Sequence, residues 1–300
     1  MKKLSIIAVL LLAFQIHAQQ DPQYTQYMYN MNVINPAYAG SRENLSLGLL
    51  YRTQWAGIDG GPETSTFFGH APISDKLGLG LSAISDQIGP VKETNLYADI
   101  SYTLELGREN RLAFGIKAGA TFHNIGLAGI DLVDSGDPFF QDISSTTPNI
   151  GAGVFYYTNK YYVSLSVPNL LSAVHLDDNG LKIGSETQHY FLTGGYVFDL
   201  SRNTELKPSF LVKSAFGAPV SFDVNVNARF YKKFEIGGSY RLDDSFSALV
   251  NFNLSPAVRI GYAYDGVTSG IRPFAIASHE VMLLFDLNFS RRVSRSPRYF

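Results

Sequence analysis

Apolar and polar residues alternate along much of this chain, and the stretch 222–231 (FDVNVNARFY) carries the pattern most clearly. One face of this stretch collects Phe222, Val224, Val226, Ala228 and Phe230. The opposite face collects Asp223, Asn225, Asn227, Arg229 and Tyr231. A period of two residues is that of an extended strand whose two faces meet different surroundings. The stretch therefore predicts a β-strand with one apolar and one polar face.

The same alternation recurs along the chain and predicts about fourteen strands. Their expected ranges are 45–56, 63–72, 77–86, 93–105, 111–123, 149–158, 161–167, 188–200, 205–215, 221–231, 233–242, 245–254, 257–265 and 279–289. In the third range, Leu77, Leu79 and Leu81 share one face, and small residues share the other. Repeated strands with an apolar outer face and a polar inner face are typical of transmembrane β-barrels.

The connections between these strands are sorted by length. Short connections such as Ser74-Asp75 and Lys232-Lys233 alternate with longer ones, and the long stretches 124–148, 168–187 and 266–278 each follow an odd-numbered strand. In an up-and-down barrel, every second connection lies on the same side of the membrane. The order therefore predicts short turns on the periplasmic side, long loops outside, and both chain termini on the periplasmic side.

A soluble β-sandwich is the alternative, because it also buries one face of each strand and solvates the other. The number of strands and the sorted connections argue against it. Aromatic residues also recur near strand ends, as in the girdles at a membrane interface: Tyr51, Trp55, Tyr97, Tyr102, Tyr156, Tyr157, Tyr196, Tyr240, Tyr262 and Tyr264. We therefore predict an all-β fold, an up-and-down transmembrane antiparallel barrel over residues 45–290.

The two ends of the chain differ from the barrel pattern. Residues 1–20 combine the basic pair Lys2-Lys3, an apolar run from Leu4 to Ile16 and the small Ala18, an order typical of a secretory signal peptide cleaved after Ala18. The apolar run is too short for a membrane-spanning helix, which needs about 20 residues. The predicted domains are a signal peptide (1–18), an N-terminal periplasmic or plug segment (19–44), the barrel (45–290) and a basic periplasmic tail (291–300).

Composition fits an exported barrel. Charged residues make up 17% of the chain, below the usual quarter, and 45% of the residues are hydrophobic. The chain has no cysteine, so strand pairing and barrel closure must supply the stability that disulfides give many exported proteins. The net charge of −2 and the lack of a basic stripe give no sign of a nucleic-acid partner.

Candidate catalytic and metal-binding groups are sparse. His279 and Glu280 are adjacent, so in a strand their side chains point to opposite faces and cannot act on one substrate together. The loop residues Asp131, Asp134, Asp137 and Asp142 offer oxygen ligands for Ca²⁺, but their spacing does not match a calcium loop. Asp and Gly are also ordinary loop residues. We therefore predict a protein that is not an enzyme and uses no cofactor or metal.

The predicted inner face of the barrel carries charges of both signs. By register it collects Arg52, Asp99, Lys117, Lys207, Lys213, Asp223, Arg229, Glu235, Arg241, Arg259 and Asp286. Opposite charges can pair across strands inside a closed lumen. An open porin also lines its pore with charges, so this set alone leaves both a plugged barrel and a channel open.

The N-terminal segment offers a plug for this lumen. Its candidate plug or partner-docking residues are Tyr24, Tyr27, Tyr29, Asn35, Pro36, Tyr38 and Gly40. Tyrosine rings can be buried while their hydroxyl groups meet polar groups of the lumen wall. Asn35-Pro36 would fix a bend, and Gly40 would let the chain turn into the first strand. A frayed periplasmic terminus is the alternative, and the density of aromatic residues favours an ordered segment.

Four sequence blocks resemble those of a known family. They are QYMYNMNVINPAYAG (26–40), YRTQW (51–55), GPET (61–64) and SHEV (278–281). With these blocks the chain resembles the PorP/SprF family, outer-membrane proteins associated with the type IX secretion and gliding machinery of Bacteroidetes. The resemblance runs from the signal peptide to the last strand. It implies a non-enzymatic barrel in the outer membrane of a Gram-negative bacterium, with no established functional residues to carry over.

Two functional hypotheses remain open at this stage. The first is a docking barrel, for which the resemblance implies two kinds of partner. These are type IX secretion components, such as periplasmic ring or peptidoglycan-linked proteins, and the C-terminal sorting domains of secreted cargo held at the cell surface. The second is a porin-like channel or transporter for small solutes. An outer-membrane lipid-modifying enzyme is a third possibility, which the sparse catalytic groups disfavour.

Overall fold

The computed structural model describes residues 22–42, 44–126, 142–171, 174–178, 181–185, 188–216 and 218–287. The predicted signal peptide, the predicted basic tail and the loop residues Asp131, Asp134 and Asp137 lie outside the described residues. None of the helices in the described part of the chain is long and apolar enough to cross a membrane.

The described chain folds into strands that follow the sequence prediction closely. They are β1 (Leu45–Thr53), β2 (Glu63–Pro72), β3 (Leu77–Ile88), β4 (Val91–Glu105), β5 (Arg111–Ile125), β6 (Ile143–Tyr157), β7 (Tyr161–Val167), β8 (Val174–Asp178), β9 (Leu181–Ser185), β10 (His189–Tyr196), β11 (Phe198–Ser201), β12 (Thr204–Ala215), β13 (Ser221–Phe230), β14 (Phe234–Arg241), β15 (Ser245–Ser255), β16 (Val258–Val267) and β17 (Ala277–Leu287). Every predicted strand range overlaps at least one of them.

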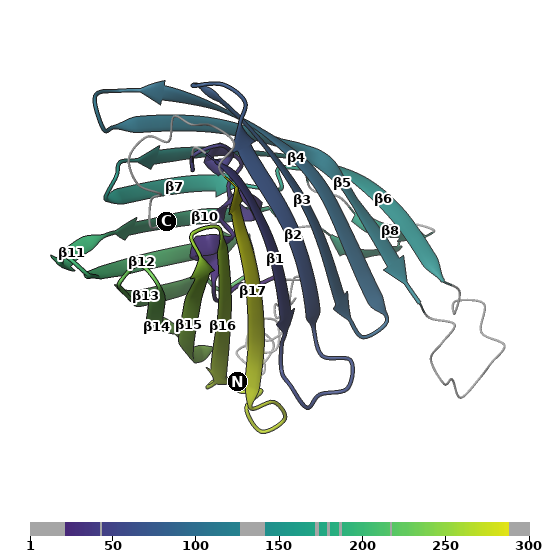
Figure 1. The fold of residues 1–300 in the computed structure, drawn as a ribbon. Coiled ribbons are helices and arrows are strands. Elements are labelled where there is room, and N and C mark those ends of the chain that lie inside the picture. The colour runs from purple at the N-terminus through teal and green to yellow at the C-terminus, as the bar shows by residue number, and fades with distance from the viewer. Residues whose placement is uncertain are drawn as a thin grey trace, which may run out of the picture.

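The strands form a closed antiparallel barrel (Figure 1). Strands that are adjacent in the chain pair with each other around the wall, β1 pairs with β17, and β10 pairs with β12 to complete the ring. β11 continues β10 past Val197 and also pairs with β12, so the two are parts of one wall strand. The result is the fourteen-stranded up-and-down barrel that the sequence predicts. β8 and β9 form a separate hairpin in the connection between β7 and β10.

The two faces of each strand meet different surroundings, as the alternation predicts. On β13, the outward Val226 is 46% exposed and the inward Asn227 is 0% exposed. Large apolar side chains are exposed on the outside of nearly every wall strand, as a lipid-facing surface requires. One residue departs from the prediction. Tyr231 lies beyond the end of β13 with φ of 51° and is 69% exposed, so it does not belong to the inner face.

The connections lie at two ends of the barrel. The end that holds the long connections 126–142, 168–188 and 268–276 is called the long-loop end below, and the opposite end the short-turn end. The sorting has two exceptions, because the two-residue turn Gly89-Pro90 between β3 and β4 and the three-residue turn 242–244 between β14 and β15 also lie at the long-loop end. Gly89 has φ of 55°, a conformation that glycine adopts without strain.

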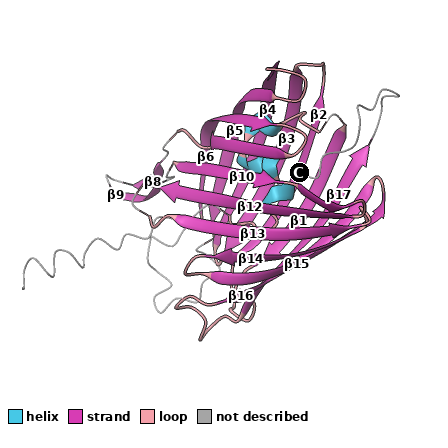
Figure 2. Cartoon of the chain, turned by 90° about the vertical axis from the view of Figure 1, so that its left-hand side faces the viewer, coloured by secondary structure: helices cyan, strands magenta, loops and turns pink. Residues whose placement is uncertain are grey.

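Residues 22–42, called the plug below, lie inside the barrel (Figure 2). They contain the short helices η1 (Tyr27–Tyr29), α2 (Met31–Ile34) and η2 (Pro36–Tyr38), and every residue from Tyr24 to Ala39 is buried. Gln23 contacts Arg241 where β14 reaches the long-loop end, and Gly40 contacts His70 where β2 reaches the short-turn end. The plug therefore runs the length of the lumen.

The direction of the plug corrects one sequence-based expectation. The sequence predicts that both ends of the chain lie on the short-turn side of the barrel. Leu287, the last described residue, does lie there opposite Leu45. Pro22, the first described residue, instead lies at the long-loop end beside Arg241 and Asp223, with which it lines a recess. The chain passes down through the lumen before it begins the first strand of the wall.

Candidate functional site

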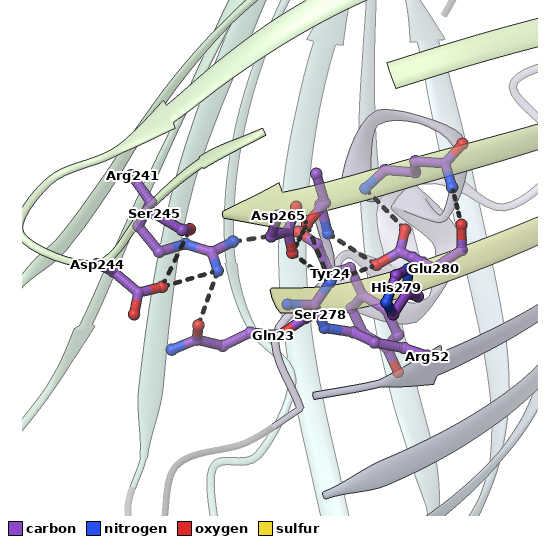
Figure 3. A network of polar contacts seen from close by, with 12 residues as sticks. Gln23, Tyr24, Arg52, Arg241, Asp244, Ser245, Asp265, Ser278, His279 and Glu280 are labelled. Carbon is purple, nitrogen blue, oxygen red and sulfur yellow. Dashed lines mark hydrogen bonds and ion pairs between the residues drawn. The ribbon is translucent and has the colours of Figure 1, made fainter. Parts of the chain in front are cut away.

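The interface between the plug and the barrel wall is the candidate functional site. Its densest part lies near the long-loop end, where Glu280 of β17 receives two backbone N–H groups of the plug (Figure 3). Thr25 N donates to Glu280 Oε2 over 2.9 Å, and Gln26 N donates to Oε1 over 2.8 Å. Hydrogen bonds to a charged acceptor are stronger than neutral ones, so this carboxylate fixes the plug backbone to the wall.

Arg52 of β1 balances this carboxylate and a second one. Its Nη1 lies 3.2 Å from Glu280 Oε2 and 2.7 Å from Asp265 Oδ2 of β16. Thr25 joins the same cluster, because its hydroxyl donates to Asp265 Oδ2 over 2.7 Å and accepts from Arg52 Nη1 over 3.0 Å. All four side chains are buried, so each charge depends on its partners in place of water.

A second ion pair holds the start of the plug. Arg241 Nη2 lies 2.7 Å from Asp223 Oδ2, and Arg241 Nη1 donates to Gln23 Oε1 over 2.8 Å. The Tyr24 hydroxyl lies 2.9 Å from Thr66 Oγ1 on the opposite wall, in β2. The plug is thereby attached to both sides of the lumen at the long-loop end.

The middle of the plug rests on a charged group of β12, β14 and β16. Tyr29 donates its hydroxyl hydrogen to Glu235, and the Lys207 ammonium and Arg259 guanidinium lie 4.6 Å and 5.0 Å from the centre of its ring. Such cation–π contacts strengthen where water is excluded. Tyr27 accepts a hydrogen bond from Asn225 Nδ2 over 3.1 Å.

On the other side of the lumen, Asn32 of α2 meets an ion pair. Lys117 Nζ of β5 lies 2.8 Å from Asp99 Oδ1 of β4, and Asn32 Nδ2 donates to Asp99 Oδ2 over 3.2 Å. Gly80 on β3 makes room for this contact, because a Cβ there would lie 2.7 Å from Asn32 Oδ1. The small residues that the sequence places on the inner face of β3 therefore let the plug approach the wall.

Asn35 fixes the conformation of the plug near the short-turn end. Its Oδ1 accepts from Ala37 N over 2.8 Å, which caps η2 with Pro36 in the first turn. Its Nδ2 donates to Ser164 Oγ of β7 over 2.6 Å. A Cβ on Gly115 of β5 would collide with the Ala37 backbone, so a glycine is needed there. One side chain thus serves both the local turn and the attachment to the wall.

Tyr38 and Gly40 complete the plug at the short-turn end. The Tyr38 ring lies edge-on to His70 and to Phe155, with ring centres 5.2 Å and 5.3 Å apart. Gly40 has φ of 73° and donates its N–H to His70 Nδ1 over 3.2 Å. The positive φ and the close wall at Gly78, whose Cα would lie 2.7 Å from a Cβ on residue 40, both require glycine.

Of the remaining predicted inner-face charges, Asp286 binds the end of the plug, whereas Arg229 and Lys213 contact residues of the wall. Arg229 pairs with Glu205. Asp286 pairs with Arg42 at the end of the plug over 3.1 Å. Lys213 lies over the Phe191 ring at 5.9 Å. Each of these residues faces the lumen, so the register of the strands brings every predicted charge to the inner side.

Three buried residues of the interface are absent from the charged residues that the sequence predicts for the inner face: Glu280, Asp265 and His70. Glu280 points inward while His279 points outward and meets the Tyr262 hydroxyl at 2.7 Å, as expected for adjacent strand residues. The strand pairing carries the missing signal, because Glu280 lies directly opposite Arg52 in the β1–β17 register. Among the described residues, no three His, Asp or Glu side chains are arranged to hold a metal ion.

Comparisons with known proteins agree with this architecture. The model of the family described as type IX secretion system membrane protein PorP/SprF matches residues 16–285. No curated protein matches the sequence. The CymD monoaromatic hydrocarbon channel superposes with a TM-score of 0.55 at 12% identity, covering 87% of this chain and 93% of that one. The Ralstonia pickettii toluene transporter TbuX gives a TM-score of 0.53 at 11% identity, with 86% and 93% covered. At these identities the two structures share the barrel fold alone.

Proposed function

Because the chain belongs to the PorP/SprF family of type IX secretion system membrane proteins, we propose that it is a non-enzymatic docking barrel whose lumen is closed by its own N-terminal segment. The fold and the family support a location in the outer membrane. In this proposal the signal peptide is removed after Ala18 during export. The barrel then binds secretion components at the periplasmic side or holds the sorting domains of secreted cargo at the cell surface.

The plug is the observation that carries this proposal. It contacts the wall along the whole lumen, from Gln23 with Arg241 to Gly40 with His70. A pore for solutes needs a continuous path of water, whereas a docking protein needs rigid ends that present fixed surfaces. The buried ion pairs and the two backbone hydrogen bonds to Glu280 favour rigidity. They support a structural role for the lumen.

A channel for small solutes is the second candidate. A recess at the long-loop end reaches from Pro22 and Tyr24 to the wall residues Phe191 and Leu211. The structures of the CymD hydrocarbon channel and the TbuX toluene transporter share the fold. The recess ends on the plug, so transport would require the plug to move. A plug that shifts within the barrel would let one protein serve both functions.

Affinity capture from the native outer membrane tests the docking proposal. The full chain, tagged in an exposed connection at the short-turn end such as 106–110, is compared with the same chain lacking residues 23–38. We expect the full chain to recover one defined set of secretion components or secreted proteins. The plug-deleted barrel should recover less of that set, because its ends have lost their internal support. A correctly folded full chain that recovers no partner above the level of an unrelated tagged barrel would refute the docking role.

A further inference from the structure

The turn between β13 and β14, at the short-turn end, has a backbone conformation that strains the residues in it. Tyr231 and Lys232 have φ of 51° and 56°, and Lys233 N donates to Phe230 O over 2.9 Å. Two central residues with positive φ and this hydrogen bond define a type I′ turn, which Asn and Gly adopt readily. Here an aromatic and a long basic side chain occupy the two positions. An Asn-Gly pair would close the same hairpin with less strain.

Neighbouring parts of the wall hold this conformation from both sides. Tyr231 N donates to Asn203 O, in the turn between β11 and β12, over 2.7 Å. On the other side, Asn253 of β15 donates from its backbone N to Lys233 O over 2.7 Å and from Nδ2 to Lys232 O over 2.6 Å. Strained backbone persists where the surrounding structure determines it, and such strain concentrates at functional sites. The backbone of the turn is therefore fixed before any partner binds.

The side chains of this turn are exposed at the end of the barrel. Tyr231 is 69% exposed, and Lys232 and Lys233 are exposed beside it. Arg202, in the adjacent turn, is exposed as well. These four residues are called the basic cluster below. Tyrosine and arginine are frequent among the residues that dominate protein interfaces. A turn that is already rigid also loses little conformational freedom on binding, which favours affinity.

The carboxylates of the adjoining strand ends already have basic partners. Asp199 of β11 lies 2.8 Å from Lys160 Nζ, and Glu205 of β12 pairs with Arg229. Within the described ranges, the three bases of the basic cluster form no ion pair. The chain after Leu287 carries four arginines and no acidic side chain, so it supplies no carboxylate side chain to these bases.

The charges of the short-turn end are unevenly distributed. On the other side of this end, the turns 73–76 and 106–110 balance Lys76 and Arg108 with Asp75 and Glu109. The turns 202–203 and 231–233 carry bases alone. A surface of one sign attracts and orients a partner of the opposite sign. The basic cluster therefore suits an acidic partner.

We propose that the basic cluster binds an acidic segment of a periplasmic secretion component. Carboxylates of that segment pair with Arg202, Lys232 and Lys233, and the Tyr231 ring packs against its chain. The phosphates of membrane lipids carry the same charge as these carboxylates. A lipid headgroup is mobile and needs no fixed turn, so the strain and the three hydrogen bonds that hold it favour a protein. The inference rests on the proposed docking function and gives its periplasmic side a site.

Binding of a defined acidic probe tests the basic cluster. The purified full chain, in nanodiscs of phosphatidylcholine, is titrated into the heptapeptide GEDFEDG, which carries a neutral fluorophore, and fluorescence anisotropy is recorded. The control peptide GQNFQNG has the same shape, with amides in place of carboxylates. We expect saturable binding of the acidic probe. The affinity for the amide peptide should be about tenfold weaker, because charge pairs supply much of the attraction.

Two variants with an equal loss of charge locate the binding. Lys232→Gln with Lys233→Gln removes two bases from the basic cluster, whereas Lys76→Gln with Arg108→Gln removes two bases from the other side of the same end. The first variant should weaken binding of the acidic probe about tenfold, and the second by less than about twofold. Absence of saturable binding, equal affinity for the two peptides, or equal affinity of the two variants would each overturn the inference.

The strain of the turn gives a second readout. Tyr231→Asn with Lys232→Gly installs the residues that a type I′ turn favours. This variant should unfold at a higher temperature than the parent, measured by heat-modified mobility on gels, and should bind the acidic probe about tenfold more weakly. A lower unfolding temperature, or unchanged binding of the probe, would contradict the inference.

Capture from the native outer membrane separates this inference from the docking function. The Lys232→Gln, Lys233→Gln chain should recover about tenfold less of the periplasmic components than the parent. Equal recovery by the two chains would overturn the site and leave the docking function standing. Native mass spectrometry of the extracted proteins tests for lipid. A phospholipid that the parent retains and the double variant lacks would assign the basic cluster to lipid headgroups and overturn the inference.

Discussion

Gln26 donates its backbone N–H to Glu280 over 2.8 Å although the two residues are 254 positions apart. The bond joins the start of the plug to the last strand of the wall. Glu280 lies opposite Arg52 in the β1–β17 pairing, which is the pairing that joins the first strand to the last. Closure of the wall therefore assembles the carboxylate and guanidinium that hold the plug. Glu280 and Arg52 therefore take part both in barrel closure and in binding of the plug.

Glu280→Gln tests this coupling. The amide keeps the shape of the side chain but offers one acceptor oxygen where the carboxylate offers two, so one plug N–H loses its acceptor. We expect the free energy of unfolding to fall by about 1–3 kcal/mol, the cost of a buried donor left unpaired. Heat-modified mobility on gels, measured over a temperature series, reports the change. The exposed Glu63→Gln on β2 serves as the control and should unfold like the parent. Equal unfolding of both variants would contradict the coupling.

The glycines that face the plug give a prediction about fit. A Cβ at Gly115 would overlap the backbone of Ala37, whereas a Cβ at Gly107 would meet its nearest atom, Asn110 Nδ2, at 3.8 Å. Gly115→Ala should therefore displace η2 and make residues 36–38 sensitive to protease, while the barrel wall stays intact. Gly107→Ala should leave the plug protected. Protection of the plug in both variants would show that it does not rest on the wall at this position.

The membrane-facing side is tested at Val226. Its side chain is exposed on the outer face of β13, and an arginine at the bilayer midplane costs about 2–4 kcal/mol. Val226→Arg should reduce the amount of assembled barrel in the membrane, and Val226→Leu should assemble normally. Assembly can be measured from the heat-modifiable band in membrane fractions. Normal assembly of Val226→Arg would show that this face of β13 does not contact lipid.

The sidedness of the barrel can be read by labelling, because the chain has no native cysteine. Cysteine at Asp142, in the long connection after β5, should react with an impermeant maleimide on intact cells, and cysteine at Asn159 should not. The direction of the plug adds Pro22→Cys, which should react like Asp142→Cys because Pro22 lies at the same end. Labelling at Asn159 alone would invert the assignment of the two sides.

The sequence predicts the strands of the barrel wall more accurately than the contacts inside the lumen, for a physical reason. Alternation is a local signal of a face that meets lipid, so it locates strands such as β13 within a residue or two. β6 begins at Ile143, six residues before the predicted start, because the stretch ISSTTP carries no apolar alternation and is held as a strand by pairing with β5. The sequence also places Asn227 on the polar inner face, but it does not indicate which group Asn227 contacts there. In the structure Asn227 donates to Glu235 over 2.7 Å beneath the plug.

The plug illustrates the opposite case. Its aromatic residues and the Asn35-Pro36 bend predict an ordered segment, but nothing local indicates the direction in which it crosses the lumen. That direction depends on partners such as Glu280 for Gln26 and Glu235 for Tyr29, which are more than 200 residues away in the chain. Glu280 is also missed because the sequence draws attention to its neighbour His279 and not to its cross-strand partner Arg52.

The central claim, that the N-terminal segment closes the lumen, is tested most directly by conductance across a planar lipid bilayer. The full chain is compared with a chain in which residues 23–38 are deleted and the signal peptide is kept. We predict that the full chain inserts without opening a stable pore. The deleted chain should insert and conduct ions in steps of constant size, because the lumen then holds water and charged walls. Stable conductance by the full chain, or identical traces from the two proteins, would contradict the account.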